Sequence, residues 1–363
     1  MNAGTLNMTR PTSRPATGRL AAWRPFLLTA VAAAALACVP LGVDNYTLSL
    51  LARAVALGLL AVSTALLTGV AGLPSLGQVA PYGVGAYVTA VLAGAEITVG
   101  PVQLAASAGA AAVFSAVTGI VIVRTRNVIF LSVTLAVGVL AAEVAGQWRS
   151  LTGGTDGTGR VEPTTPFWGA EPLIDDAHVY WYALATAAVV VAITTAALLS
   201  TPGRLLRGCR DSEARMRASG HRVTGYLLLA NIAAGAIAGV GGSLLVTSQR
   251  FVSPSDVDFG TAALILLAVV VGGAHSMTGA LAGVAVVIAV RDWLAPPGYR
   301  ELMLGVVFVL CVYLMPKGLA GASTWLHSSL RGLGPWNGRR EKPVGRGDAD
   351  VVDRRSAGGE GNP

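Results

Sequence analysis

Long apolar stretches alternate with short polar segments along most of the chain. Each stretch predicts a helix that crosses a membrane, because a lipid interior offers the backbone no hydrogen-bond partner outside its own helix. The ten predicted spans cover about residues 26–43, 48–70, 82–95, 102–123, 128–148, 179–199, 223–246, 261–271, 279–290 and 302–314. The pattern predicts an all-α, polytopic membrane protein with about ten transmembrane helices.

Three of the predicted spans, 82–95, 261–271 and 279–290, are shorter than the ~20 residues that a straight crossing needs. They lie beside glycine-rich turns. Short spans interrupted by glycine are typical of discontinuous helices around a substrate path. Helices that pack tightly through small residues give the same pattern. Both interpretations remain open at this stage.

The segment 203–225 is the only strongly charged stretch between spans. A single helix here would place Leu205, Cys209, Ser212 and Met216 on one apolar face. Ion pairs four residues apart are expected between Asp211 and Arg215 and between Glu213 and Arg217. A glycine, Gly220, is expected to end the helix in a left-handed conformation. Such a helix either anchors in the membrane interface or docks a soluble partner.

Composition supports the membrane assignment, because 53% of the residues are hydrophobic and only 12% are charged, against about 25% charged in soluble domains. The formal net charge of +7 raises the question of nucleic acid, but the basic residues lie in loops between spans, where they set orientation. The three cysteines, Cys38, Cys209 and Cys311, are too widely spaced to predict a disulfide framework. Cys209 is expected to be water-accessible and the other two shielded. No Cys/His cluster has the spacing of a metal site.

The basic residues also predict the topology. With the N-terminus inside, 20 of the 26 lysines and arginines lie on the inner side, which favours two cytoplasmic termini. Arg53 lies within a span and is expected to extend to the outer surface. The predicted organisation is a disordered basic cytoplasmic tail (1–24), a membrane domain (25–321) with a cytoplasmic loop (201–224), and a disordered cytoplasmic tail (322–363).

Several short motifs follow one another in a fixed order. They are GLPSLGQ at 72–78, GVGAY at 83–87, RTR at 124–126 before FLSVTLA at 130–136, TGGTDG at 152–157, DSEA at 211–214, GGAHSMTG at 272–279 and MPKGLAG at 315–321. Together they resemble the LivM-type permease subunit of ABC importers for branched-chain amino acids, and DSEA with Gly220 resembles the coupling loop of that family. Arg215 replaces a usual alanine and Ala280 a usual proline.

The resemblance implies three groups of functional residues. The residues that couple to the ATP-binding subunit are Arg207, Asp211, Glu213, Ala214 and Gly220. The candidates for the translocation path are Ser75, Gln78, Tyr82 and Thr134. The outer loop contributes Thr152, Gly153, Gly154, Asp156 and Gly157. Two structural alternatives remain open: Ser75 and Gln78 satisfy backbone groups freed by the turn, and the outer glycines form a tight turn.

The chain has only two lysines, and neither lies in the Gly-Lys-Ser/Thr context of a phosphate-binding loop. It is therefore expected to leave ATP hydrolysis to partner subunits. Since it also has no cluster with the spacing of a metal site, it is expected to bind no cofactor or metal itself. The resemblance implies a LivH-type second permease, two ATP-binding cassette subunits and an extracytoplasmic solute-binding protein. It also implies a place in the inner membrane, embedded in the lipid bilayer, with no nucleic acid bound.

Two other functions compete with an importer of branched-chain amino acids. An ion-coupled secondary transporter needs acidic residues at mid-membrane, and none of the 19 acidic residues falls clearly at the middle of a predicted span, which disfavours it. A permease for urea or short amides uses the same scaffold in the family that this chain resembles. The sequence leaves that alternative open.

Overall fold

The computed structural model describes residues 44–274, 276–294, 296, 298–314 and 318. The predicted span 26–43, both predicted tails, Cys38 and most of the motif at 315–321 lie outside these residues. Every described helix belongs to one compact unit. No β-strand forms among the described residues, where the extended backbone pairs only in an isolated bridge between Val99 and Thr165.

Helices account for each of the nine predicted spans that fall within the described residues. Their bounds are α2 (Asn45–Ala65), η2 (Leu66–Ala71), α3 (Val79–Gly94), α4 (Gly100–Ile122), α5 (Asn127–Gln147), α6 (Arg149–Thr152), η3 (Gly154–Asp156), α7 (Asp176–Leu199), α8 (Thr201–Asp211), α9 (Glu213–Ala218), α10 (Val223–Gln249), η4 (Pro254–Val257), α11 (Phe259–Gly272), α12 (Met277–Ile288), η5 (Ala289–Leu294) and α13 (Arg300–Leu314). Seven helical segments of the described part are long and apolar enough to cross a membrane, and two shorter apolar helices, Val79–Gly94 and Leu302–Cys311, accompany them. The prediction of an all-α, polytopic membrane protein is confirmed.

Two of the three spans predicted to be short are longer than the sequence indicated. The segments Pro254–Gly272 and Met277–Leu294 have 19 and 18 residues, because η4 precedes α11 and η5 continues α12. The charged residues Arg291 and Asp292 end the apolar run without ending the helix. Only α3 stays short, with 16 residues.

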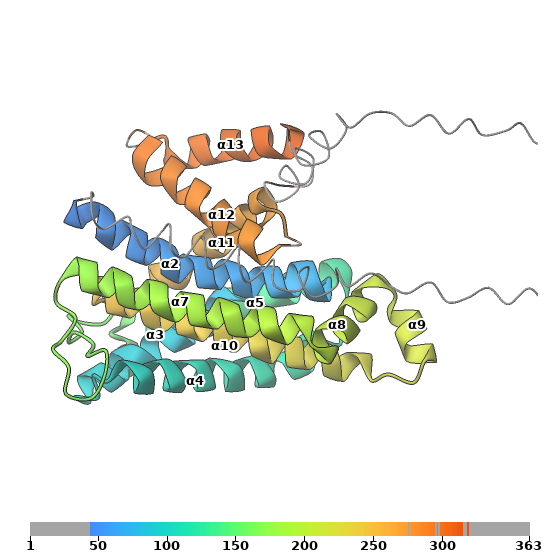
Figure 1. Ribbon diagram of the computed structural model, residues 1–363, viewed down its shortest axis with the longest axis horizontal. Helices are drawn as coiled ribbons and strands as arrows, with labels where there is room; N and C mark the ends of the chain where they lie inside the picture. Colours follow the sequence, from blue (N-terminus) through green and yellow to red (C-terminus); the bar gives the residue numbers. More distant parts are fainter. Residues whose placement is uncertain (1–43, 275, 295, 297, 315–317, 319–363) are drawn as a thin grey trace, which may run out of the picture. The chain divides into compact units, whose positions relative to one another are not determined.

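The helices α2 and α10 form the centre of the unit (Figure 1). α10 packs against α4, α2 and α3, and 78% of its apolar window is buried, against 72% for α2 and only 22–28% for α4, α5 and α7. The exposed apolar faces of these three outer helices fit a lipid environment or a neighbouring subunit. The buried position of α2 and α10 therefore sets where the other helices lie.

Glycines bring α3 and α10 into backbone contact. A Cβ atom added to Gly242 would lie 2.0 Å from the carbonyl oxygen of Tyr82, and one added to Gly85 would lie 2.2 Å from the carbonyl oxygen of Gly239. Membrane helices associate through such small residues, because close approach of the backbones replaces the hydrophobic driving force that lipid removes.

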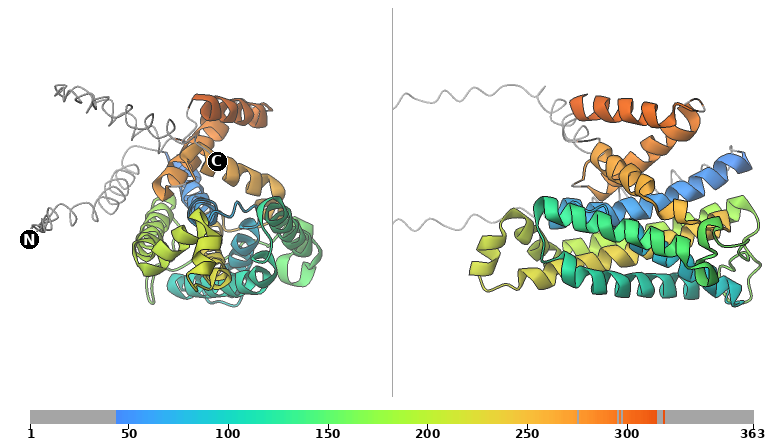
Figure 2. Two further views of the ribbon diagram at one scale, coloured as in Figure 1. Left: turned by 90° about the vertical axis from the view of Figure 1, so that its right-hand side faces the viewer. Right: turned by 180° about the vertical axis from the view of Figure 1, so that it is seen from behind.

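The connecting segments gather at two opposite ends of the unit (Figures 1 and 2). At one end, the segment 148–175 is hydrogen-bonded to the segment after α10, for example between Thr158 and the Val252 carbonyl. At the other end, α8 and α9 lie where α7 ends and α10 begins. Along the chain the connecting segments lie alternately at one end and at the other, which agrees with the order of the predicted spans.

Candidate functional site

The charged segment after α7 forms two helices, α8 and α9, and the prediction of one continuous helix was wrong. Ser212 adopts an extended backbone (φ −163°, ψ 99°) and separates them. Its hydroxyl accepts a hydrogen bond from the Arg215 amide at 3.3 Å. Serine is a preferred N-cap because its side chain satisfies an amide of the first helical turn. The break at Ser212 therefore starts a new helix.

The buried face of α8 also differs from the predicted one. Gly203, Leu206 and Cys209 are buried, whereas Leu205 is only half-buried. Cys209 is 1% exposed, so the prediction of a water-accessible thiol was wrong. Burial raises the pKa of the Cys209 thiol, and the Glu213 carboxylate adds to the rise, which makes this cysteine a poor nucleophile.

Two contacts tie α8 to the ends of membrane helices. The Arg210 guanidinium donates to the carbonyl oxygen of Gly69 in η2, and its side chain packs on Gly72, where a Cβ would lie 2.8 Å from the Arg210 Cγ. The Arg207 guanidinium donates to the Leu198 carbonyl of α7 at 3.2 Å. α8 is therefore hydrogen-bonded directly to the ends of η2 and α7.

Glu213 links α9 to the turn between α4 and α5. Its carboxylate lies 2.9 Å from the Arg126 Nε and 3.2 Å from an Arg217 Nη. The predicted pair of Glu213 with Arg217 is confirmed, whereas no ion pair joins Asp211 to Arg215, both of which the structure describes. The Arg126 guanidinium also donates to the carbonyl oxygens of Val123 and Thr125. Arg126 thus ties α9 to the turn that joins α4 and α5.

Gly220 has a φ of 81°, as predicted. The His221 amide donates to the Met216 carbonyl at 3.1 Å, which closes the end of α9 in the manner of a left-handed cap. A Cβ atom on Gly220 would have no atom within 4 Å. Only the backbone conformation therefore favours glycine here. The remaining residues of the implied coupling group, Asp211 and Ala214, are exposed on the surface of the two helices.

The segment from Leu73 to Gln78 is non-helical and joins η2 to α3, and its residues are buried except for Pro74, which is exposed, and Leu76, which is half-buried. The Ser75 hydroxyl accepts from the Gly77 amide at 3.2 Å, and the Gln78 side-chain carbonyl accepts from the Ser63 hydroxyl at 2.8 Å. The Thr134 hydroxyl of α5 accepts from the Leu76 amide at 3.3 Å. In this conformation the three polar side chains hold the turn together.

Three of the four path candidates meet at one place. Ser75, Gln78 and Thr134 line a cavity of about 10 Å³, which has room for one water and not for an amino acid. Tyr82 does not line that cavity and is fully buried elsewhere in the helix packing. Between these three side chains the structure therefore has no opening of the size of an amino acid.

The TGGTDG motif forms a compact turn at the end of the unit opposite α8. Gly153, Gly154 and Gly157 all have φ between 72° and 78°, and a Cβ on Gly153 would lie 1.9 Å from the Gly157 carbonyl oxygen. The Thr152 hydroxyl donates to carbonyls at the end of α5. Asp156 is exposed on the surface of the turn.

A family model described as the permease component of branched-chain amino acid transport systems matches residues 46–312. The chain belongs to this family. The permease is 28% identical over 302 residues to the high-affinity branched-chain amino acid transport system permease protein LivM of Salmonella typhimurium and of Escherichia coli. Each match covers 76% of this chain and 69% of the relative. No solved structure matches the permease significantly.

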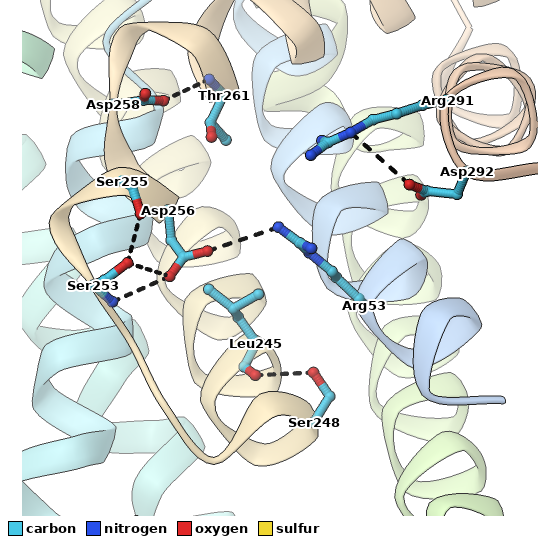
Figure 3. A network of polar contacts seen from close by, with 10 residues as sticks. All are labelled: Arg53, Leu245, Ser248, Ser253, Ser255, Asp256, Asp258, Thr261, Arg291 and Asp292. Atoms are coloured by element: carbon cyan, nitrogen blue, oxygen red, sulfur yellow. Dashed lines mark hydrogen bonds and ion pairs between the residues drawn. The ribbon is translucent and has the colours of Figure 1, made fainter. Parts of the chain in front are cut away.

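Two polar contacts of the permease were missed from its sequence. Arg126 was counted only among the basic residues of the inner side. Its position directly beside the end of a span could have indicated a contact with the charged segment. Arg53 was expected to extend to the outer surface, and its side chain is partly exposed, but its ion pair with Asp256 of η4 at 3.7 Å was not foreseen (Figure 3). The SPSD sequence at 253–256 forms a capping box, and a serine followed three residues later by an acidic residue is a pattern that indicates one.

Proposed function

We propose that this chain is the LivM-type membrane subunit of an ATP-driven importer that carries branched-chain amino acids or similar small polar solutes. The family match over residues 46–312 carries this proposal, and the relatives named LivM support the substrate class. A second permease of LivH type, two ATP-binding cassette subunits and an extracytoplasmic binding protein would complete the transporter.

The contacts of α8 and α9 support a mechanical role. ATP-driven closure of the partner subunits would push on the exposed side of these helices. The push would reach η2 through Arg210, α7 through Arg207 and α5 through Arg126. Packed helices switch between discrete arrangements rather than deform continuously, so such a push would favour alternating access. This chain binds no cofactor in the proposed mechanism, and its partners hydrolyse the ATP.

The proposed orientation follows from the basic residues. With 20 of 26 lysines and arginines on one side, the end that carries α8 and α9 faces the cytoplasm, as do both termini. The opposite end, with the turn at 152–157, then faces the binding protein in an inner or plasma membrane.

The test is to reconstitute this chain in vesicles together with the proteins that the neighbouring genes encode. Co-purification of an ATP-binding subunit and ATP-dependent uptake of labelled leucine, competed by isoleucine and valine, are the expected results. Uptake competed by urea and not by leucine would assign the solute class to short amides. Uptake that persists without ATP and follows an ion gradient would contradict the importer assignment.

Substitution of Gly220 tests the coupling role of α9. Gly220→Val is expected to lower transport per ATP hydrolysed, because a β-branched residue at positive φ costs about 1–3 kcal/mol and would redirect the chain into α10. Gly220→Asn is the matched control, because asparagine accepts this conformation. Uptake and ATPase activity measured in vesicles decide the matter, and equal coupling in both variants would remove Gly220 from the coupling group.

A further inference from the structure

Three of the five buried side-chain atoms without a hydrogen-bond partner in the described part of the chain lie around one acidic residue. They are the Arg53 Nε and the hydroxyls of Tyr82 and Tyr87. The Asp256 carboxylate acts electrostatically on both hydroxyls, and the Arg53 guanidinium acts on that of Tyr82. Native proteins rarely leave buried polar atoms unpaired, so this concentration needs an explanation.

The ion pair of Arg53 with Asp256, at the centre of this group, is long. One Arg53 Nη lies 3.7 Å from the Asp256 Oδ1, which is beyond hydrogen-bonding distance. The other carboxylate oxygen, Oδ2, accepts from the amide and the hydroxyl of Ser253 at 3.1 Å (Figure 3). The Asp256 Oδ1 can therefore still accept a hydrogen bond, and the Arg53 guanidinium can still donate one.

One residue of this group, Tyr87, also lines an apolar cavity, whereas Arg53, Tyr82 and Asp256 do not. The cavity has a volume of about 370 Å³ and is lined by Tyr87, Gly83, Val84 and Val257 among others, with Val257 directly following Asp256 in the chain. A branched aliphatic side chain fits such a space. Through Tyr87 and Val257 the cavity for hydrocarbon therefore adjoins the group that contains the charged pair.

We propose that Arg53 and Asp256 form an entry site for a zwitterionic α-amino acid with an aliphatic side chain. The guanidinium of Arg53 binds the carboxylate of the solute, assisted by the hydroxyl of Tyr87, which lines the cavity. The Asp256 Oδ1 binds the ammonium group of the solute in place of its long contact with Arg53. The aliphatic side chain enters the neighbouring cavity. The site lies at the end of the unit opposite α8 and α9, and the proposal rests on the proposed function for the solute class.

The choice of a zwitterionic solute follows from the chemistry of the Arg53 guanidinium and the Asp256 carboxylate. A carboxylate is the preferred partner of a guanidinium, because it accepts several N–H groups at once. An ammonium group is the complementary donor for Oδ1, which accepts no hydrogen bond from the described residues. Arg53 is 38% exposed at its side chain, which leaves the pair reachable, whereas Asp256 is 14% exposed and largely shielded.

The experiment measures binding of labelled leucine to the purified complex without the binding protein, and compares it with 4-methylpentanoate, which lacks only the ammonium group. In the wild type, leucine should bind more tightly than 4-methylpentanoate. Asp256→Asn keeps the size of the side chain and the acceptor for Ser253, and is expected to weaken leucine binding by roughly tenfold or more with little effect on 4-methylpentanoate. Arg53→Gln is expected to weaken binding of both.

Asp258→Asn is the matched control, because Asp258 caps α11 through the Thr261 amide and asparagine caps a helix equally well. This control should bind leucine as the wild type does. Equal losses for both ligands in Asp256→Asn, or no loss, would overturn the entry site. So would the absence of saturable leucine binding to the wild-type complex. Co-purification and ATP-dependent uptake in the wild type report on the proposed function separately.

Discussion

Gly242→Val is expected to remove most of the folded permease from the membrane. The new side chain would begin 2.0 Å from the Tyr82 carbonyl oxygen and 2.8 Å from the Ala86 amide nitrogen. Both are backbone atoms of α3, so no side chain can move aside. Overpacking of a close contact costs about 1–3 kcal/mol and sometimes more, and this contact holds α3 against the central helix. The yield of monodisperse protein and its thermal midpoint measure the effect.

Gly109→Val is the control for that experiment. Gly109 also lies inside a helix, α4, but a Cβ there would have no atom within 4 Å. Both substitutions carry the same change in helix propensity, so the difference between them reports the close contact alone. Equal yields and equal midpoints for the two variants would show that α3 and α10 do not approach as closely as described.

Glu213→Arg is expected to reduce transport per ATP hydrolysed by about tenfold or more while leaving the permease folded. The pair of Glu213 with Arg126 is about one-third exposed on each side, so its loss costs only about 1 kcal/mol of stability. It is nevertheless the direct ionic link from α9 to the turn between α4 and α5 among the described residues. Reversing the charge places a third guanidinium group beside those of Arg126 and Arg217 and opens that link.

The double variant Glu213→Arg with Arg126→Glu restores the pair with its charges exchanged. Recovery of transport in this variant would assign Glu213 to the contact within the permease. Without recovery, and with less ATP-binding subunit co-purified, Glu213 would instead contact a basic group of the partner. Arg217→Gln is the control, because it removes only the exposed pair within α9, which contributes a few tenths of a kcal/mol.

Much of the fold followed from periodic hydrophobicity. An apolar run of span length has one stable arrangement in lipid, so the helices could be located without knowledge of their neighbours. The positive φ of Gly220 was equally local, since it follows from the end of a helical pattern. The motif order alone also indicated the family.

The partners of the polar side chains depended on tertiary structure. Arg126 and Glu213 lie 87 positions apart in the chain, and Arg53 and Asp256 more than 200. No local pattern encodes such pairs, because each exists only once the packing of the helices around α2 and α10 has brought its two distant segments together. The burial of Cys209 has the same origin: a helical wheel defines the faces of α8, but the helices packed against it decide which face is covered.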